Sequence, residues 1–343
     1  MLHLLKQNFF MKPDSQQKED IIEDDNTIKE LTFSTINEIN ICHKIKAIPY
    51  YFNYYKIVVN YNHIREFKRL SKIIDDTKGE YLMLKYNVHD DKQYSLKDYL
   101  IRLSNAKEVI LFSLETYSCL LNMFLVFHKN KISFFDLHHN NIYITKYKTP
   151  ILSGFENSIL IEELNEEYIT KIIKNTKEFT YKPLEVHLLF YLIINNESCL
   201  SSSLSYEICE HFVKNMHVLS FFDDMTREKY KKECMIVLSK YINKPRSIII
   251  TDIIKYSDTW DNYGLSILYL HIFFVELNSF SLKETFVNDF SKVLFKNISA
   301  NPLNRLTLDN TSNSFNELFN NNNDWSCVNK IQYDQVELFK RSL

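Results

Sequence analysis

The chain contains very little glycine, and this scarcity excludes a whole class of phosphate-binding loop. Only three of its 343 residues are glycine: Gly79, Gly154 and Gly264. Loops that cradle a dinucleotide or a nucleoside triphosphate need at least two glycines within about eight residues. The sequence therefore has neither the dinucleotide-binding loop nor the Walker-type loop.

An excess of basic charge, closely spaced cysteines and long apolar runs are also missing. Lys and Arg number 41 against 43 Asp and Glu, a net charge of −2, so a dedicated nucleic-acid-binding protein is not expected. The six cysteines form no Cys-x-x-Cys pair, which favours reduced thiols in a cytoplasmic protein. Uncharged apolar runs stay below about 18 residues, and the start lacks the features of a signal peptide. We therefore expect an intracellular protein without a membrane span.

The residues that are present predict a folded protein with a small mixed region near the start. Hydrophobic residues make up 45% of the chain, which is ordinary for a globular protein. Residues 12–30 are polar and acidic, and residues 1–30 are expected to form a mobile lead-in. Apolar residues recur at helical spacing over 34–48, and the β-branched and aromatic segments 55–61 and 80–86 predict two antiparallel strands.

Helical patterns dominate from residue 88 onward. Apolar residues at helical spacing predict helices at 96–103, 106–128 and 263–277, and further helical patterns lie at 186–195, 205–215 and 226–242. The sequence thus predicts an α+β protein. Its expected parts are a lead-in (1–30), a reduced mixed region (31–87) and a helical region (88–343) with a helical insertion at about 186–255.

The segment that follows the long helix carries the densest set of polar residues. Asp136-Leu-His138-His-Asn-Asn141 lies directly before a short apolar strand. This segment resembles the catalytic loop of protein kinases, His-Arg-Asp-Leu-Lys-x-x-Asn. The resemblance implies that Asp136 receives the attacking hydroxyl, that Asn141 binds Mg²⁺, and that His138 stands where the family has a lysine contacting the γ-phosphate. A polar turn between a helix and a strand is the alternative.

Residues before the loop resemble the smaller lobe of the same family. Glu38 resembles the helix glutamate that pairs with the ATP-positioning lysine in protein kinases. Leu84 resembles the gatekeeper position, and Asn87 would lie in the hinge beside the nucleotide. The resemblance implies a cofactor-binding role for Leu84, Asn87 and Asn141.

Residues after the loop resemble the larger lobe. Tyr-Lys-Pro-Leu-Glu185 resembles the Tyr-x-Ala-Pro-Glu end of the activation segment, with the proline shifted by one position. Arg305 matches the arginine that pairs with this glutamate, and Asp261 matches the aspartate that accepts hydrogen bonds from the catalytic-loop backbone. The resemblance spans residues 31–310 and implies a bilobal protein-kinase-like fold with a reduced N-lobe and a mostly helical C-lobe.

The sequence departs from the family at the metal-binding motif. Asp-Phe-Gly has become Gly154-Phe-Glu156, so the carboxylate that bridges Mg²⁺ to the phosphates is missing. Asn141 and Glu156 remain as candidate metal ligands. The lysine-bearing strand is also expected to be missing, because Lys18 and Lys29 lie in a polar stretch without strand alternation.

These departures leave three functional hypotheses open. The first is a pseudokinase that binds ATP and Mg²⁺ weakly and acts as a binding or regulatory module for a protein partner. The second is an active, atypical serine/threonine kinase that modifies a protein substrate, with phosphorylation sites at Ser158, Thr170, Thr176 and Thr180. The third, suggested only by Leu-His138, is a small-molecule phosphotransferase. The AT-rich composition and the Leu-His-x-x-Asn-Ile run resemble kinase-like proteins of large nucleocytoplasmic DNA viruses, which implies the host cytoplasm.

Overall fold

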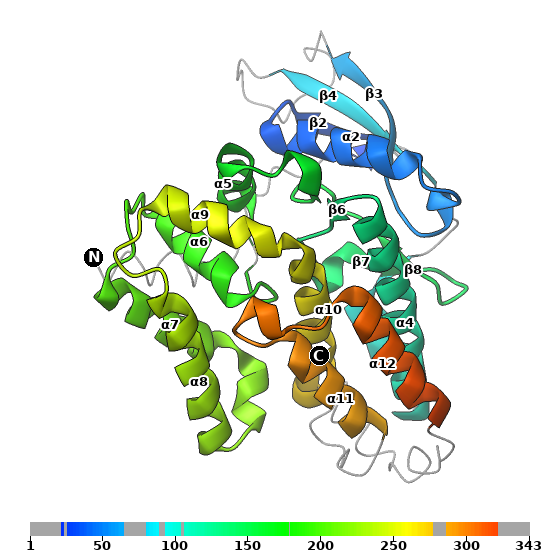
Figure 1. Cartoon of the computed structure of the whole chain (residues 1–343). Coiled ribbons are helices and arrows are strands. Elements are labelled where there is room, and N and C mark those ends of the chain that lie inside the picture. The colour runs from blue at the N-terminus through cyan, green and yellow to red at the C-terminus, as the bar shows by residue number, and fades with distance from the viewer. Residues whose placement is uncertain are drawn as a thin grey trace.

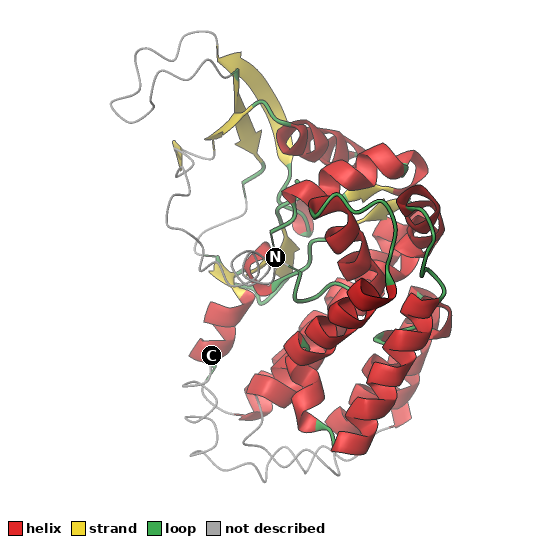
Figure 2. Ribbon diagram, turned by 90° about the vertical axis from the view of Figure 1, so that its left-hand side faces the viewer, coloured by secondary structure: helices red, strands yellow, loops and turns green. Residues whose placement is uncertain are grey.

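The chain folds as an α+β protein in which the long strands lie at one end and helices make up most of the rest (Figures 1 and 2). The computed structural model describes residues 22–23, 26–64, 80–88, 93–103, 106–177, 179–276 and 286–321. Most of the expected lead-in and the end of the expected helical region lie outside these residues.

The larger sheet is antiparallel and has the strand order β1-β2-β4-β3. Its strands are β1 (Ile22–Glu23), β2 (Asn26–Glu30), β3 (Val58–Ile64) and β4 (Tyr81–Tyr86). The two strands predicted from the sequence are therefore confirmed as β3 and β4, although β3 begins three residues later than expected.

The expectation that the lead-in extends to residue 30 is wrong, because residues 26–30 form strand β2. It pairs with β4 along its whole length, with Lys29 opposite Leu82 and Thr27 opposite Leu84. The side chains of β2 do not alternate between apolar and polar, so the strand carries little signal of its own. Backbone hydrogen bonds to the apolar strand β4 account for it instead.

Helix α2 (Phe33–Lys46) contacts strand β3. The side chain of Thr32 caps its first turn by accepting a hydrogen bond from the backbone N–H of Thr35. Ile41 and Ile45 are fully buried on one face, which confirms the amphipathic helix predicted here. The same face carries Glu38 toward the sheet.

The other helices follow the predicted order closely. The expected segments 96–103 and 106–128 are α3 (Leu96–Arg102) and α4 (Ala106–Lys129), and the segment 263–277 is α10 (Trp260–Leu270) continued by π-helical residues His271–Glu276. The remaining helices are α5 (Glu166–Asn175), α6 (Leu184–Ile194), α7 (Ser202–Asn215), α8 (Asp224–Ser239), α9 (Arg246–Ile253), α11 (Phe286–Asn297) and α12 (Leu308–Asn321).

Short strands frame the loop between α4 and α5. They are β5 (Tyr94–Ser95), β6 (Ile132–Ser133), β7 (Ile142–Ile144), β8 (Pro150–Leu152) and β9 (Ile159–Leu160). Strand β7 pairs with β5 and β8, and β6 pairs with β9. These pairings hold the chain on both sides of the polar segment 136–141.

Helix α4 runs through the core beside α10 and α12 (Figure 1). In the described part of the chain, Glu108–Lys129 alone has the length and hydropathy of a bilayer-spanning helix, and 61% of its most apolar window is buried inside the protein. Packing against α10 and α12 accounts for this apolar surface, as in the core helix of a globular fold.

The segment 186–255 is helical, as predicted. It comprises most of α6 together with α7, α8 and α9. Helices α7 and α8 pack side by side, and α6 contacts both α7 and α9 (Figure 1). This layer lies on the side of α10 away from α12.

Candidate functional site

Asp261, in the first turn of α10, anchors the polar loop from beneath. Its two carboxylate oxygens accept hydrogen bonds from the backbone N–H groups of Phe134 (2.9 Å) and Phe135 (2.7 Å). Phe135 has a φ of +60°, a conformation that a non-glycine residue rarely adopts without such support. Burial raises the pKa of Asp261, although the two backbone hydrogen bonds oppose this shift. The contact expected from the sequence is present.

The loop brings Asp136, Asn141 and Gly154 together. The Asn141 side-chain amide donates a hydrogen bond to the Asp136 carbonyl oxygen at 2.9 Å, and the N–H of Ser153 donates to the Asn141 carbonyl at 3.0 Å. A Cβ atom at Gly154 would lie 3.0 Å from Asn141 Oδ1. The position that lacks a carboxylate therefore faces the candidate metal-binding asparagine.

An aromatic cluster fixes the segment that follows Gly154. Phe155 is fully buried, and its ring packs edge-on against Phe134 at a centroid distance of 5.5 Å. It also contacts the rings of Tyr55 and Phe127 at 6.5 and 6.2 Å. Burying a phenylalanine contributes about 1.5–3 kcal/mol, so this anchor sets where the neighbouring Gly154 and Glu156 lie.

Each carboxylate oxygen of Asp136 has a partner from another side chain. Lys182 Nζ lies 3.0 Å from Oδ1, and the Asn157 side-chain amide donates to Oδ2 at 2.8 Å. Burial alone would raise the pKa of Asp136, but the Lys182 ammonium and the Asn157 hydrogen bond outweigh it and lower the pKa. This pairing makes Asp136 a weak proton acceptor.

Lys182 and Asn157 were not among the predicted site residues. Lys182 lies within the Tyr-Lys-Pro-Leu-Glu segment, and its side chain is only 3% exposed. Its Nζ also donates to the Phe135 carbonyl at 2.6 Å. The sequence around Lys182 does not indicate that this side chain is buried, because its partner Asp136 lies 46 positions earlier in the chain.

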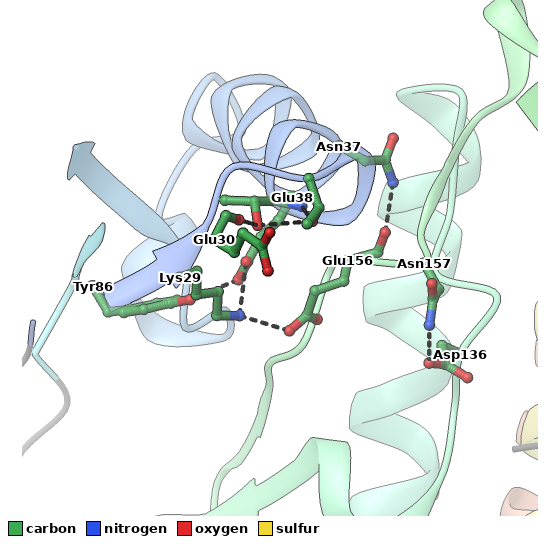
Figure 3. A network of polar contacts seen from close by, with 10 residues as sticks. Lys29, Glu30, Asn37, Glu38, Tyr86, Asp136, Glu156 and Asn157 are labelled. Atoms are coloured by element: carbon green, nitrogen blue, oxygen red, sulfur yellow. Dashed lines mark hydrogen bonds and ion pairs between the residues drawn. The ribbon is translucent and has the colours of Figure 1, made fainter. Parts of the chain in front are cut away.

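The expectation that no strand before Glu38 carries a lysine is wrong, because Lys29 lies on a strand. It lies on β2, and its Nζ is 3.0 Å from Glu38 Oε2 and 2.8 Å from Glu156 Oε1 (Figure 3). The hydroxyl of Tyr86 on β4 donates to the other Glu38 oxygen at 2.9 Å. Glu38 thus has the lysine partner that the resemblance implied.

The two carboxylates on Lys29 influence each other. Burial, reinforced by the nearby charge of Glu156, raises the pKa of Glu38 to about 7, even though Lys29 and Tyr86 oppose the shift. Burial would lower the pKa of Lys29, but Glu38 and Glu156 together raise it. Lys29 is therefore a permanent cation that two acidic groups share.

Glu156 is directed to Lys29, although the sequence placed it among the candidate metal ligands beside Asn141 (Figure 3). Among the residues that the structure describes, no group of three or more His, Cys, Asp or Glu side chains is arranged to hold a metal ion. Mg²⁺ prefers carboxylate ligands, whereas Asn141 is neutral and Glu156 is paired with Lys29, so these two residues fit a Mg²⁺ ion poorly.

The predicted cofactor-binding residues of the sheet have other contacts. Leu84 is completely buried within β4. The Asn87 side chain accepts a hydrogen bond from the N–H of Ile57 at 2.7 Å and donates to the carbonyl of Tyr55 at 2.9 Å. Asn87 thus fastens the end of β4 to the residues before β3.

His138 is half-buried at the start of the 3₁₀ turn His139–Asn141.

The Glu185–Arg305 ion pair expected from the sequence is present and bidentate. The two nitrogen–oxygen distances are 2.6 and 2.8 Å, and both side chains are almost fully buried. The indole N–H of Trp260 also donates to Glu185 Oε1 at 3.2 Å. The pair ties the start of α6 to the loop before α12.

Two of the four proposed phosphorylation sites are inaccessible. Ser158 is fully buried and its hydroxyl donates to the Phe134 carbonyl, while Thr176 is 6% exposed and donates to the Ile172 carbonyl. A kinase acting on this chain could reach Thr180, which is exposed, and the half-buried Thr170.

No protein-family model matches the sequence, and no curated protein matches it.

Proposed function

We propose that the chain is a protein-kinase-fold pseudokinase, a binding or regulatory module with weak or no phosphoryl transfer. Three long-range contacts support a bilobal kinase-like fold: Lys29 with Glu38, Asp261 with the loop backbone, and Glu185 with Arg305. They join a small sheet, a polar loop and a helical region in the order that the resemblance implies. The Glu185–Arg305 pair also disfavours the small-molecule phosphotransferase hypothesis.

The observation that carries the proposal is the position of Gly154 beside Asn141. A carboxylate there would bridge Mg²⁺ to the phosphates in an active kinase, and glycine supplies none. Loss of one preorganised charge-stabilising group slows a reaction about 10²- to 10³-fold. The lowered pKa of Asp136 reduces its capacity as a base still further.

The test is a phosphoryl-transfer assay with Mg·ATP, using the full chain and a set of protein substrates. We expect no transfer above that of the Asp136→Asn variant. Robust turnover that Asp136→Asn abolishes would reject the pseudokinase proposal.

The Lys29–Glu38 ion pair favours one second candidate, the active atypical kinase. In that case Asp136 would orient the substrate hydroxyl, Asn141 and Glu156 would hold the metal ion, and His138 would contact the γ-phosphate. This candidate predicts that Glu156→Gln abolishes turnover, and unchanged turnover would remove the metal role of Glu156.

A further inference from the structure

The two carboxylates that share Lys29 are held very differently. Glu38 is 1% exposed and lies on the buried face of α2, where Tyr86 also binds it. Glu156 is 34% exposed. Lys29 therefore has a buried partner in Glu38 and a partly exposed, exchangeable partner in Glu156.

The backbone of Glu156 is fixed, although its side chain is partly exposed. The side-chain amide of Asn37 donates to the carbonyl oxygens of Glu156 at 2.9 Å and of Ser158 at 2.8 Å. Asn37 is held in turn by the hydroxyl of Tyr168, which donates to its Oδ1 at 2.7 Å. Rotation of the Glu156 side chain would release Lys29 without moving the chain around it.

Electrostatics favours such an exchange. Two carboxylates on one ammonium repel each other, and the charge of Glu156 adds to the larger effect of burial in raising the pKa of Glu38. An incoming anion that replaced Glu156 would keep the charge-assisted hydrogen bond of Lys29. It would also leave the Glu38–Lys29 pair intact.

We propose that Glu156 is a built-in competitor for the cation Lys29, so that a nucleoside triphosphate binds only by displacing it. The inference rests on the proposed function, which supplies the nucleotide as the ligand. It adds that competition by Glu156 limits the affinity for this nucleotide. The competitor neutralises Lys29 when no ligand is bound. Nucleotide binding through Lys29 then requires no divalent cation.

The test measures ATP affinity by titration calorimetry on the full chain, once in EDTA and once in excess Mg²⁺. Glu156→Gln keeps the size of the side chain and removes its charge. We expect ATP to bind this variant about two- to fivefold more tightly than the unmodified chain in EDTA, in line with the strength of a partly exposed ion pair.

Matched variants separate competition from a general change in charge. Glu162→Gln removes an exposed carboxylate that pairs with Lys44 at 3.0 Å, and it should leave ATP affinity unchanged. Lys29→Met combined with Glu156→Gln should abolish the gain. Glu156→Asp, which shortens the side chain, should give an intermediate gain and serves as a second variant if Glu156→Gln folds poorly.

Unchanged or weaker ATP binding by both Glu156 variants would overturn the proposal, as would an equal gain in Glu162→Gln or an absence of binding in every variant. A loss of affinity confined to the Mg²⁺ titration would identify Glu156 as a metal ligand and also overturn it. Detection of turnover would instead reject the pseudokinase proposal, so the two failures are distinguishable.

Discussion

Lys182 Nζ lies 3.0 Å from Asp136 Oδ1 in an ion pair that is nearly closed to solvent. The same ammonium donates to the Phe135 carbonyl at 2.6 Å and lies 4.7 Å from the centre of the Phe135 ring. Asp136 therefore connects the polar loop to the segment before α6. In this arrangement its carboxylate works as a structural anchor.

Replacing Lys182 with methionine should lower the free energy of unfolding by about 3 kcal/mol, because it leaves a buried carboxylate without its cation. Urea denaturation of the two proteins measures the difference. Lys292→Met is the matched control, since Lys292 pairs with Asp289 on the surface and both side chains are more than half exposed. The control should change stability by less than about 1 kcal/mol. Equal effects of the two substitutions would contradict the anchoring role.

The shared lysine predicts a pH dependence of stability. The pKa of Glu38 is raised from 4.5 to about 7 in the folded protein, so folding takes up a proton between these values. The contribution of Glu38 to stability is therefore full below pH 4.5 and is lost as the pH rises toward 7. Glu156→Gln removes one of the two causes of the raised pKa, while burial remains.

Urea denaturation across this pH window should therefore show a smaller decline in stability for Glu156→Gln than for the unmodified chain. Glu162→Gln, on the exposed Lys44 pair, should keep the original decline. If all three proteins lose stability with the same slope, the charge of Glu156 does not reach Glu38.

Long-range contacts between residues of recognisable motifs could be predicted from the sequence. Asp261, Glu185 and Arg305 each belong to a short segment with its own signature, and their contacts are as expected. Helix α4 was also predictable, because a wide apolar stripe repeats at helical spacing along it, and most of α10 was predictable as an apolar helical segment.

Lys29 and Lys182 could not be placed from the sequence, for two physical reasons. Strand β2 depends on backbone pairing to β4, so its own residues show no strand pattern around Lys29. Lys182 is buried because Asp136 and the Phe135 carbonyl converge on it from a distant loop. In both cases the partner lies far along the chain, and local composition resembles a solvated segment.

The buried pair between Arg305 and Glu185 should tolerate no conservative exchange. Arg305→Lys keeps the charge but cannot form two parallel hydrogen bonds to Glu185, so we expect a loss of about 2 kcal/mol in unfolding free energy. Arg246→Lys, on a half-exposed arginine that binds Asn196, should cost less than about 0.5 kcal/mol. Equal stability of the two variants would show that the bidentate geometry contributes little.

Alanine substitutions at Gly154 and Gly264 compare a glycine that lies against Asn141 with one that lies inside a helix. Gly154 has a φ of +78°, and a Cβ there would lie 3.0 Å from Asn141 Oδ1. Gly154→Ala should therefore lower the unfolding free energy by about 1–2 kcal/mol, since alanine is strained at positive φ and Asn141 must move.

Gly264 lies inside α10, where a Cβ would meet the Tyr181 carbonyl at 3.5 Å and Leu137 Cβ at 3.7 Å, which are ordinary contacts. Gly264→Ala should raise stability by about 0.5–1 kcal/mol, because alanine is the better helix former. Thermal and urea unfolding of both variants measure these opposite shifts. A destabilised Gly264→Ala beside an unaffected Gly154→Ala would mean that Asn141 is not confined by Gly154. The backbone at position 154 would then have room for a side chain, whereas the proposal of an inactive site, which rests on the carboxylate that glycine does not supply, would stand unchanged.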